Sequence, residues 1–584
     1  MKSLGLTSRF RRIWRGLDRA LRSAGEEIDK NVLGRLGRVR VVWKFLAVWL
    51  LAAGAVLAGL LTQFSGLRAY YQVLRPTPGG MYSEGMEGDF TTASPLYAVT
   101  DVDTSVSRLL FAGLLAYDNQ NHLVADLADS WTHNADGSVY TVHLRPDLRW
   151  HDGLPLTADD VVFTYQTIQN PDARSPFLSS WQGVAVTALD GQTVQFKLPN
   201  PLSSFPYSLT NGIVPKHILG ALNPPDLRSA AFNTSNPVGA GPFMWQSIGV
   251  SGVDETAEEQ IVLAPFPHYW AGEPKLGSFS IHAYAGQQAL LAAYRSKEIT
   301  AVAGIDTVPK DIAQDKTSHV YTLPLTAGTY VFFKTTNPIL KDVKVRQALV
   351  AGADRGAVID SLGYMAIPVD EPLLKGQLGY DQKYAQAADQ VAKARQLLDA
   401  AGWRMGTDGM RSRKGQPLTF VLAATDSTEY RTVAAALQKQ WQALGVQVTV
   451  QTLPADAFQE ALSRQSYDAL LYGITIGADP DVFVYWDGSQ SDAQLNFSNY
   501  TSTVADLALE AGRTRLDARL RAVKYRTFLN AWRQDAPALG LYQPRLLYIS
   551  HVPVYGIGTG PVNADADRFN NVQNWMIHVG WETR

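Results

Sequence analysis

An uncharged apolar run near the N-terminus constrains this chain more than any other feature of its 584 residues. Residues 45–67 form 23 positions without a charge, between Lys44 and Arg68. Because a helix needs roughly 20 apolar residues to cross a bilayer, the run predicts one transmembrane helix. Its length and the long basic region before it favour an uncleaved anchor over a cleaved signal peptide, whose apolar core has about 7–15 residues. Since basic flanks stay in the cytoplasm, we expect a single-pass cell-membrane protein with a cytoplasmic N-terminus and an extracytoplasmic body.

Charge is distributed unevenly along the chain. Residues 1–44 hold 12 Lys and Arg against four Asp and Glu, whereas the remaining residues hold 40 against 50. A basic tail on a mildly acidic body predicts that the tail is a targeting signal or contacts a membrane, and it argues against a nucleic-acid-binding body. Apolar residues recur in the tail at helical spacing. The tail is therefore either an amphipathic helix on the anionic inner leaflet or a solvated basic segment.

Composition limits the chemistry of the body. The chain contains no cysteine, which excludes disulfides, thiolate metal sites and a cysteine nucleophile. It contains 14 Trp, 25 Tyr and 21 Phe. This excess of rings indicates large cores, a cleft lined by aromatic side chains, or both.

Residues 127–163 contain the clearest local structure signals. Asp136-Gly137 and Asp152-Gly153 are dipeptides that close tight turns. Residues 139–145 alternate with the period of a half-buried strand. Thr157 stands three positions before Asp160 and in front of apolar residues at helical spacing, a capping-box-like helix start. A similar hairpin signal, Asp190-Gly191, lies between two further strand-like runs.

This stretch resembles the signature region of the extracellular solute-binding proteins that serve ABC importers of peptides, dipeptides or nickel complexes. Residues 213–217, 239–243 and 342–349 are similar to further landmarks of that family, in the family's order. Lys334 stands where members have asparagine. The matching residues of the signature region are Leu127-Ala128-Asp129-Ser130-Trp131, Leu144-Arg145, and Asp152-Gly153-Leu154-Pro155-Leu156-Thr157-Ala158-Asp159-Asp160-Val161-Val162-Phe163.

The resemblance implies an α/β, two-lobed periplasmic-binding-protein-like fold with a hinge and an extra subdomain in the first lobe, preceded by one transmembrane helix. Strand-like runs alternate with helical stripes between residues 391 and 450, which predicts an α/β second lobe. We also expect a buried helix at 106–115 and one strand at 539–549. The expected segments are a basic cytoplasmic tail at 1–44, the transmembrane helix at 45–67, a linker at 68–79, the first lobe at 80–325 with an inserted subdomain at about 115–205, the second lobe at 326–540, and a return to the first lobe at 541–584.

Motifs for catalysis or metal binding are weak. Gly239-Ala240-Gly241 lacks the third glycine of a dinucleotide fingerprint, and no zinc-protease or nucleophile-elbow motif occurs. His133, His143 and His151 fall in one region, but a metal site needs converging ligands with their own supporting partners. We therefore expect no enzyme activity, no catalytic residue, no metal and no cofactor.

The resemblance also implies where ligand binds. In the family, backbone near Thr100 and Asp101 contacts ligand, and a second-lobe aspartate receives the peptide ammonium. Here Ile474 and Gly477 replace the family's tryptophan and aspartate, so either Asp479 or Asp481 takes that role or the ligand has no ammonium there. Asp479 is alternatively a turn acid before Pro480. The remaining candidates are rings expected near lobe edges, each of them either core or cleft: Tyr97, Trp181, Tyr330, Phe332, Tyr485 and Trp486.

The function implied is that of a membrane-anchored, extracytoplasmic receptor of an ABC importer. It would bind oligopeptides between its lobes, through the peptide backbone, and deliver them to permease subunits driven by ATPases. The alternatives are a ligand sensor or scaffold on the same fold, and a receptor for another solute such as a nickel complex or a sugar.

Overall fold

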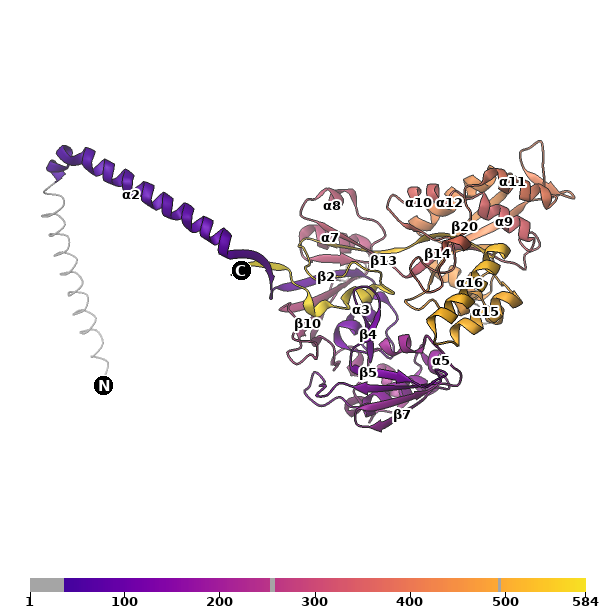
Figure 1. Ribbon diagram of the computed structural model, residues 1–584, viewed down its shortest axis with the longest axis horizontal. Coiled ribbons are helices and arrows are strands. Elements are labelled where there is room, and N and C mark those ends of the chain that lie inside the picture. Colours follow the sequence, from indigo (N-terminus) through magenta and orange to yellow (C-terminus); the bar gives the residue numbers. More distant parts are fainter. Residues whose placement is uncertain (1–35, 253–257, 492–494, 584) are drawn as a thin grey trace. The chain divides into compact units, whose positions relative to one another are not determined.

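The structure of the protein, a computed structural model, describes residues 36–252, 258–491 and 495–583 (Figure 1). The chain divides into two units, one comprising Met1–Arg75 with Val579–Arg584 and the other Pro76–His578. The helix or solvated tail expected before residue 36 lies outside the described residues.

The first unit contains the apolar run. Helix α2 (Leu36–Tyr71) includes Trp43–Gln63, the one stretch of the described residues that is long and apolar enough to cross a membrane. The expected linker at 68–79 is wrong, because α2 extends into it and strand β1 (Gln72–Thr77) occupies most of the rest. Strand β1 forms a two-stranded sheet with the C-terminal strand β24 (His578–Thr583), which supplies its backbone hydrogen-bond partners.

The second unit contains a seven-stranded mixed sheet, whose region we call the first lobe. Its strand order is β13-β23-β12-β2-β11-β10-β9, and β2 pairs in parallel with both β11 and β12. Helices α3, α7 and α8 accompany this sheet. The bounds of these elements are β2 (Met81–Glu87), α3 (Asp101–Leu110), β9 (Phe243–Ser251), β10 (Glu258–Pro265), β11 (Ser278–Tyr284), α7 (Gln287–Ser296), β12 (Ala301–Ala303), α8 (Lys310–Gln314), β13 (His319–Pro324) and β23 (Arg545–Ser550).

Strand β2 lies at the centre of this sheet and shows how its two faces differ. Tyr82 and Met86 alternate along the strand into the main core of the first lobe. Gly85 points to the other face, where an added Cβ would lie 2.5 Å from Leu290 of α7. A residue larger than glycine would have to displace the Leu290 and Ile299 side chains there. Position 84, between Tyr82 and Met86, therefore faces the main core, although it holds a glutamate.

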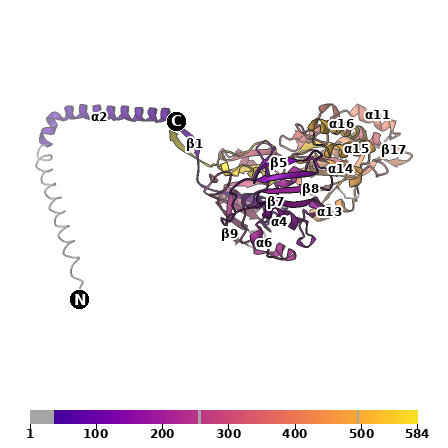
Figure 2. The same ribbon diagram turned by 60° about the horizontal axis from the view of Figure 1, so that its bottom comes forward.

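An antiparallel sheet of order β5-β6-β8-β7 forms a subdomain of the first lobe, with α4 beside it (Figure 2). The hairpin expected at Asp190-Gly191 is confirmed, since β7 and β8 pair in antiparallel register around it. The capping box is also confirmed: the Thr157 N–H donates to Asp160 Oδ2 over 2.9 Å at the start of α4. The bounds here are β3 (Leu115–Tyr117), β4 (Leu123–Ala125), β5 (Ala128–His133), β6 (Val139–Leu144), α4 (Ala158–Gln169), η2 (Pro171–Ala173), α5 (Leu178–Trp181), β7 (Ala185–Asp190), β8 (Thr193–Lys197), η3 (Phe205–Thr210), α6 (Lys216–Leu219), η4 (Pro224–Ser229) and η5 (Ala231–Asn233).

A six-stranded sheet of order β15-β22-β14-β21-β19-β20 organises what we call the second lobe. Along β14, Val331 and Phe333 enter one core and Tyr330 and Phe332 enter another, so helices cover both faces of the sheet. The bounds are β14 (Ala327–Phe333), α9 (Val343–Ala351), α10 (Arg355–Ser361), β15 (Ile367–Pro368), η7 (Gln382–Tyr384), α11 (Val391–Ala400), β16 (Arg404–Met405), β17 (Arg411–Arg413), β18 (Gln416–Pro417), β19 (Thr419–Thr425), α12 (Thr428–Gln442), β20 (Gln447–Leu453), α13 (Ala455–Ser463), β21 (Ala469–Thr475), α14 (Phe483–Trp486), η8 (Gly488–Gln490), α15 (Thr503–Arg513), α16 (Ala518–Asp535) and β22 (Ala538–Gln543).

The chain crosses between the lobes twice, at residues 325–326 and at Pro544. The two crossings lie side by side, since the Leu325 N–H donates to the Pro544 carbonyl over 2.9 Å. The single strand expected at 539–549 is wrong. Pro544, which has no N–H to continue a ladder, separates β22 of the second lobe from β23 of the first. After the second crossing, η9 (Asp565–Phe569) packs along α3, and η10 (Val572–Asn574) precedes β24.

The helix expected at 106–115 is displaced. It starts earlier, because the Thr100 hydroxyl caps α3 by accepting from the Asp103 N–H over 3.1 Å. It ends at Leu110, because the following backbone pairs with other segments: the Gly241 N–H donates to the Leu110 carbonyl over 2.8 Å.

Candidate functional site

Two adjoining cavities lie beside the subdomain, one inside the first lobe and the other between the two lobes. A cavity of about 340 Å³ is lined by Thr104, Ser107 and Arg108 of α3 and by residues of the subdomain. A second cavity of about 790 Å³ has one wall from the subdomain and one from the second lobe. Ser180 and Ser208 line both. The lining of the larger cavity includes Leu202 and Phe205 on the subdomain side and Phe483, Asp487 and Arg513 on the second-lobe side.

Four of the predicted rings lie in cores. Tyr330, Phe332 and Trp486 are fully buried in the second lobe, where the Phe332 and Trp486 rings stack with centroids 5.4 Å apart. They present no surface to a ligand. Trp181 stacks on Tyr165 with centroids 4.0 Å apart, and it is also among the residues that line the smaller cavity.

The other two rings have local partners. Tyr97 is buried below the guanidinium of Arg228, which lies 5.6 Å from its ring, and burial raises the pKa of its hydroxyl. Tyr485 is half-buried, and its hydroxyl donates to the Thr475 carbonyl over 2.9 Å. Neither ring is among the residues that line the two cavities.

Thr100 and Asp101 lie at the start of α3. The Thr100 side chain serves as the N-cap described above, and Asp101 is exposed in the first helical turn, where a carboxylate stabilises the helix dipole. Thr104, one turn further along α3, is the nearest residue of this helix that lines the smaller cavity.

Asp479 is held by its own lobe. It forms a bidentate ion pair with Arg521 of α16, with Oδ–Nη distances of 2.8 and 2.7 Å, and both side chains are buried. Burial raises the pKa of Asp479, and the guanidinium opposes that rise. Its charge also reaches the first lobe, where burial and then Asp479 raise the pKa of Tyr207. A ligand ammonium would have to compete with Arg521 for this carboxylate.

Asp481 bridges the lobes instead. Its Oδ2 accepts from the Ser204 hydroxyl of the first lobe over 3.0 Å and pairs with Arg513 of α15 at 3.2 Å. The structure therefore separates the two acids that the sequence left as alternatives. Asp479 is paired inside the second lobe, and Asp481 is at the contact between lobes.

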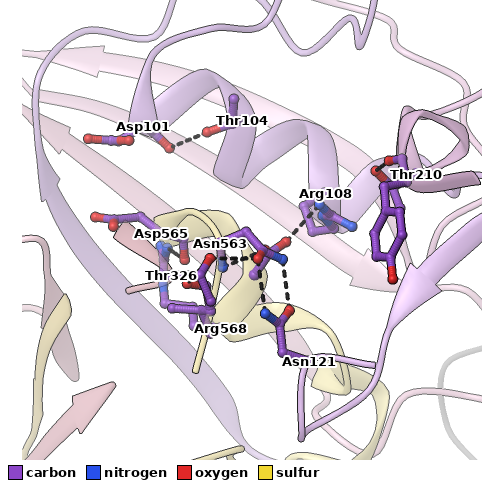
Figure 3. A network of polar contacts seen from close by, with 12 residues as sticks. Asp101, Thr104, Arg108, Asn121, Thr210, Thr326, Asn563, Asp565 and Arg568 are labelled. Atoms are coloured by element: carbon purple, nitrogen blue, oxygen red, sulfur yellow. Dashed lines mark hydrogen bonds and ion pairs between the residues drawn. The ribbon is translucent and has the colours of Figure 1, made fainter. Parts of the chain in front are cut away.

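A polar network joins α3 to the first crossing segment, at Thr326 (Figure 3). Arg108 pairs with Asp567 at 2.9 Å, and Asn563 exchanges amide hydrogen bonds with Asn121 at 2.9 and 2.8 Å. The Thr326 hydroxyl donates to Asn563 Oδ1 over 2.7 Å. The network thus ties a crossing residue to the first lobe. Sequence reasoning missed it, since no local pattern pairs residues more than 200 positions apart.

The three histidines considered as metal ligands have separate partners. His151 is held between Gly241, whose carbonyl lies 3.0 Å from Nε2, and Gly239, whose N–H donates to Nδ1 over 3.1 Å. Burial lowers the pKa of His151 to about 4. His143 contacts Thr193, and His133 contacts the Asn134 carbonyl. Across the described ranges, no group of three potential ligands gathers in metal-binding geometry.

Glu371, in the loop after β15, carries a buried carboxyl with one oxygen that has no hydrogen-bond partner among the described residues. Burial raises its pKa to about 8 from an ordinary value of 4.5. Between these values the folded protein holds a proton that the unfolded chain has lost, so the free energy of unfolding falls as pH rises.

We expect Glu371→Gln to remove this fall. Relative to the wild type, the variant should gain on the order of 1 kcal/mol or more in unfolding free energy between about pH 5 and pH 8. Urea denaturation at a series of pH values measures the difference. Parallel stability profiles for the two proteins would contradict the prediction.

Comparisons with known proteins agree with this architecture. The family model "Bacterial extracellular solute-binding proteins, family 5 Middle" matches residues 122–494. The oligopeptide-binding protein AppA of Bacillus subtilis is 26% identical over 553 residues, which cover 91% of this chain and 98% of AppA.

Two crystal structures at 25% identity share the fold. NikZ of Campylobacter jejuni, solved with Ni(L-His), has a TM-score of 0.71 over 85% of this chain and 99% of its own. The substrate-binding protein CtaP of Listeria monocytogenes has a TM-score of 0.74 over 86% of this chain and 100% of its own. These matches confirm the resemblance and the two-lobed α/β fold, in a family of solute-binding proteins rather than enzymes. The chain belongs to the bacterial extracellular solute-binding proteins of family 5.

Proposed function

We propose that this protein captures oligopeptides between its two lobes and delivers them to the permease subunits of an ABC importer. The observation that carries the proposal is the 790 Å³ cavity with one wall from each lobe, since a ligand there contacts both lobes at once. Membership of a solute-binding family and the alignment with an oligopeptide-binding protein along 91% of the chain support it.

The proposal also places the protein in the cell membrane, with its body outside the cytoplasm. Helix α2 holds the protein in the cell membrane, because its apolar stretch is long enough to cross the bilayer. The excess of Lys and Arg before this stretch keeps the N-terminus in the cytoplasm and the body outside. Western blotting of membrane and soluble fractions, with protease added to intact cells, tests both the anchor and its orientation.

Peptide binding is expected to stabilise the fold. A ligand that binds only the folded state, at a concentration 100 times its Kd, adds about 2.7 kcal/mol to the free energy of unfolding. Thermal shift and calorimetry of the full chain with a library of short peptides of graded length measure this. If no peptide gives heat or a shift, peptide binding is excluded for that library.

A matched pair of variants localises the site. Ser180 and Ser179 are neighbouring exposed residues of α5, but only Ser180 lines the two cavities. Ser180→Trp should fill the shared space and abolish peptide binding, whereas Ser179→Trp should leave the Kd unchanged. Equal effects of both would place the site elsewhere.

A small solute is the second candidate, favoured by one observation. NikZ, which shares this fold, was solved with Ni(L-His), and a cavity of 340 Å³ is within the size range of small-molecule sites. Mass spectrometry of the ligand that co-purifies with the full chain separates the two candidates. Uptake of labelled peptide by cells with and without the protein separates an importer receptor from a sensor.

A further inference from the structure

A group of four residues fastens the lobes to each other away from the two crossing segments. Ser203 and Ser204 lie in the subdomain between β8 and η3, and Asp481 and Arg513 lie in the second lobe. The Ser203 N–H and hydroxyl both donate to the Arg513 carbonyl, over 2.9 and 2.8 Å. The Ser204 hydroxyl donates to Asp481 Oδ2 over 3.0 Å. We call these four residues the clasp.

The second-lobe half of the clasp is held in place by contacts within that lobe, independent of the subdomain. Asp481 and Arg513 pair at 3.2 Å, and the Arg513 guanidinium lies 4.2 Å from the centre of the Phe483 ring. The two side chains are 12% and 25% exposed, so solvent screens the pair only in part. This arrangement fixes the Asp481 carboxylate and the last carbonyl of α15 as acceptors. The subdomain loop supplies only donors, and the two halves are complementary.

The clasp also borders the larger cavity. Arg513 lines that cavity from the second lobe, and Leu202, next to Ser203, lines it from the subdomain. Opening the lobes would break the three cross-lobe hydrogen bonds and remove one wall of the cavity. Bonds that exist only in the closed arrangement shift the equilibrium toward it, even where they do not touch the ligand.

We propose that the clasp sets ligand affinity by populating the closed state, and that Asp481 acts on the lobes rather than on the ligand. This inference rests on the proposed function for its affinity predictions, but its prediction for lobe closure does not. A protein closed for a larger share of time binds more tightly by the same factor for every ligand, because apparent affinity scales with the competent fraction.

The affinity test uses the full chain and a peptide that the wild type binds. Ser204→Ala should raise the Kd about fivefold and Asp481→Asn about tenfold, mainly through faster dissociation. Ser204→Thr keeps a hydroxyl and should restore the Kd to within about twofold. Ser179→Ala is the matched control, since this exposed serine takes no part in the clasp. Unchanged affinity in both clasp variants overturns the proposal.

The same variants distinguish a clasp from a ligand contact. If Asp481 held the ligand ammonium, Asp481→Asn would weaken peptides with a free N-terminus and spare the acetylated forms. The clasp predicts equal loss for both forms. Selective loss therefore overturns the proposal.

Lobe closure is measured without reference to affinity. Because the chain has no cysteine, spin labels attach only at introduced sites, such as Thr187→Cys in the subdomain and Lys439→Cys on α12, both exposed. Distances between the two labels, measured by pulsed electron paramagnetic resonance, should show that a smaller fraction of molecules is closed in Ser204→Ala and Asp481→Asn than in the doubly labelled wild type. We expect this difference both with and without ligand. Identical distance distributions overturn the clasp even if the wild type binds peptide. A smaller closed fraction supports it even if the wild type binds none.

Discussion

Replacing Asp479 with asparagine is expected to lower the free energy of unfolding by about 3–5 kcal/mol. Asp479 and Arg521 pair through two hydrogen bonds, and their side chains are only 7% and 8% exposed. Asparagine keeps the size of the side chain but removes its charge, so Arg521 remains buried without a counter-charge. Arginine stays protonated in proteins and cannot relieve that cost by losing a proton. Urea denaturation of the single variant measures the loss.

Two further variants test the cause. Adding Arg521→Met to Asp479→Asn removes the stranded charge and should recover part of the loss, which a double-mutant cycle quantifies. Asp311 forms a similar two-bond contact with Arg295, but their side chains are 59% and 47% exposed. Asp311→Asn should therefore cost less than about 1 kcal/mol. If Asp479→Asn instead left stability intact and weakened only peptides with a free N-terminus, Asp479 would be a ligand residue after all.

Replacing Glu84 with glutamine is expected to lower the free energy of unfolding by a similar amount, about 3–5 kcal/mol. Glu84 sits on the central strand β2, and its side chain and that of Arg568 are both fully buried. Arg568 donates to Glu84 Oε1 from Nε, over 2.9 Å, and from Nη2. Loss of the carboxylate charge leaves a permanent cation in the core of the first lobe. The pair also binds the C-terminal segment to the centre of the sheet, so this segment should lose protection from hydrogen exchange.

The converse variant should behave differently with pH. Burial already raises the pKa of Glu84, and Arg568 opposes the rise. In Arg568→Met the carboxyl loses that opposition and takes up a proton, so the loss of stability should be small in acid and should grow as pH rises. Glu84→Gln has no carboxyl to titrate there and should show no such dependence. Ser105→Ala, which removes one hydrogen bond of 3.1 Å to Arg568, is the control and should cost about 1 kcal/mol. Equal pH profiles for the two charge variants would contradict this account.

Local structure could be predicted where neighbouring residues decide it. The Thr157 capping box and the Asp190-Gly191 hairpin each depend on residues a few positions apart, and both are confirmed. Element boundaries failed where distant segments compete for backbone groups. Helix α3 ends at Leu110 because backbone near residue 241 takes its carbonyl. The segment after α2 is a strand because the C-terminus pairs with it.

The candidate site was harder to predict than the fold. Tyr330 and Phe332 were expected near a lobe edge, yet both face the same second-lobe core, since the two faces of β14 are covered by helices. Asp479 and Asp481 are two positions apart, and the local sequence leaves either of them as the candidate for the ligand ammonium. Their partners, Arg521 for one and Ser204 for the other, come from different lobes.

By itself, the sequence determined the apolar run, the turn and cap signals, and the ordered landmarks from which the family and its two-lobed fold follow. The turn and cap signals depend on short-range sterics and hydrogen bonding, and the transmembrane prediction depends only on the length and hydrophobicity of one segment. Only the tertiary structure decided which polar groups are already satisfied inside the protein. That depends on contacts such as Glu84 with Arg568, which are 484 positions apart, and on the burial that makes them strong. The physical reason is that a charged side chain can bind ligand only if no neighbouring group of the folded protein already pairs with it, and those neighbours are distant in sequence.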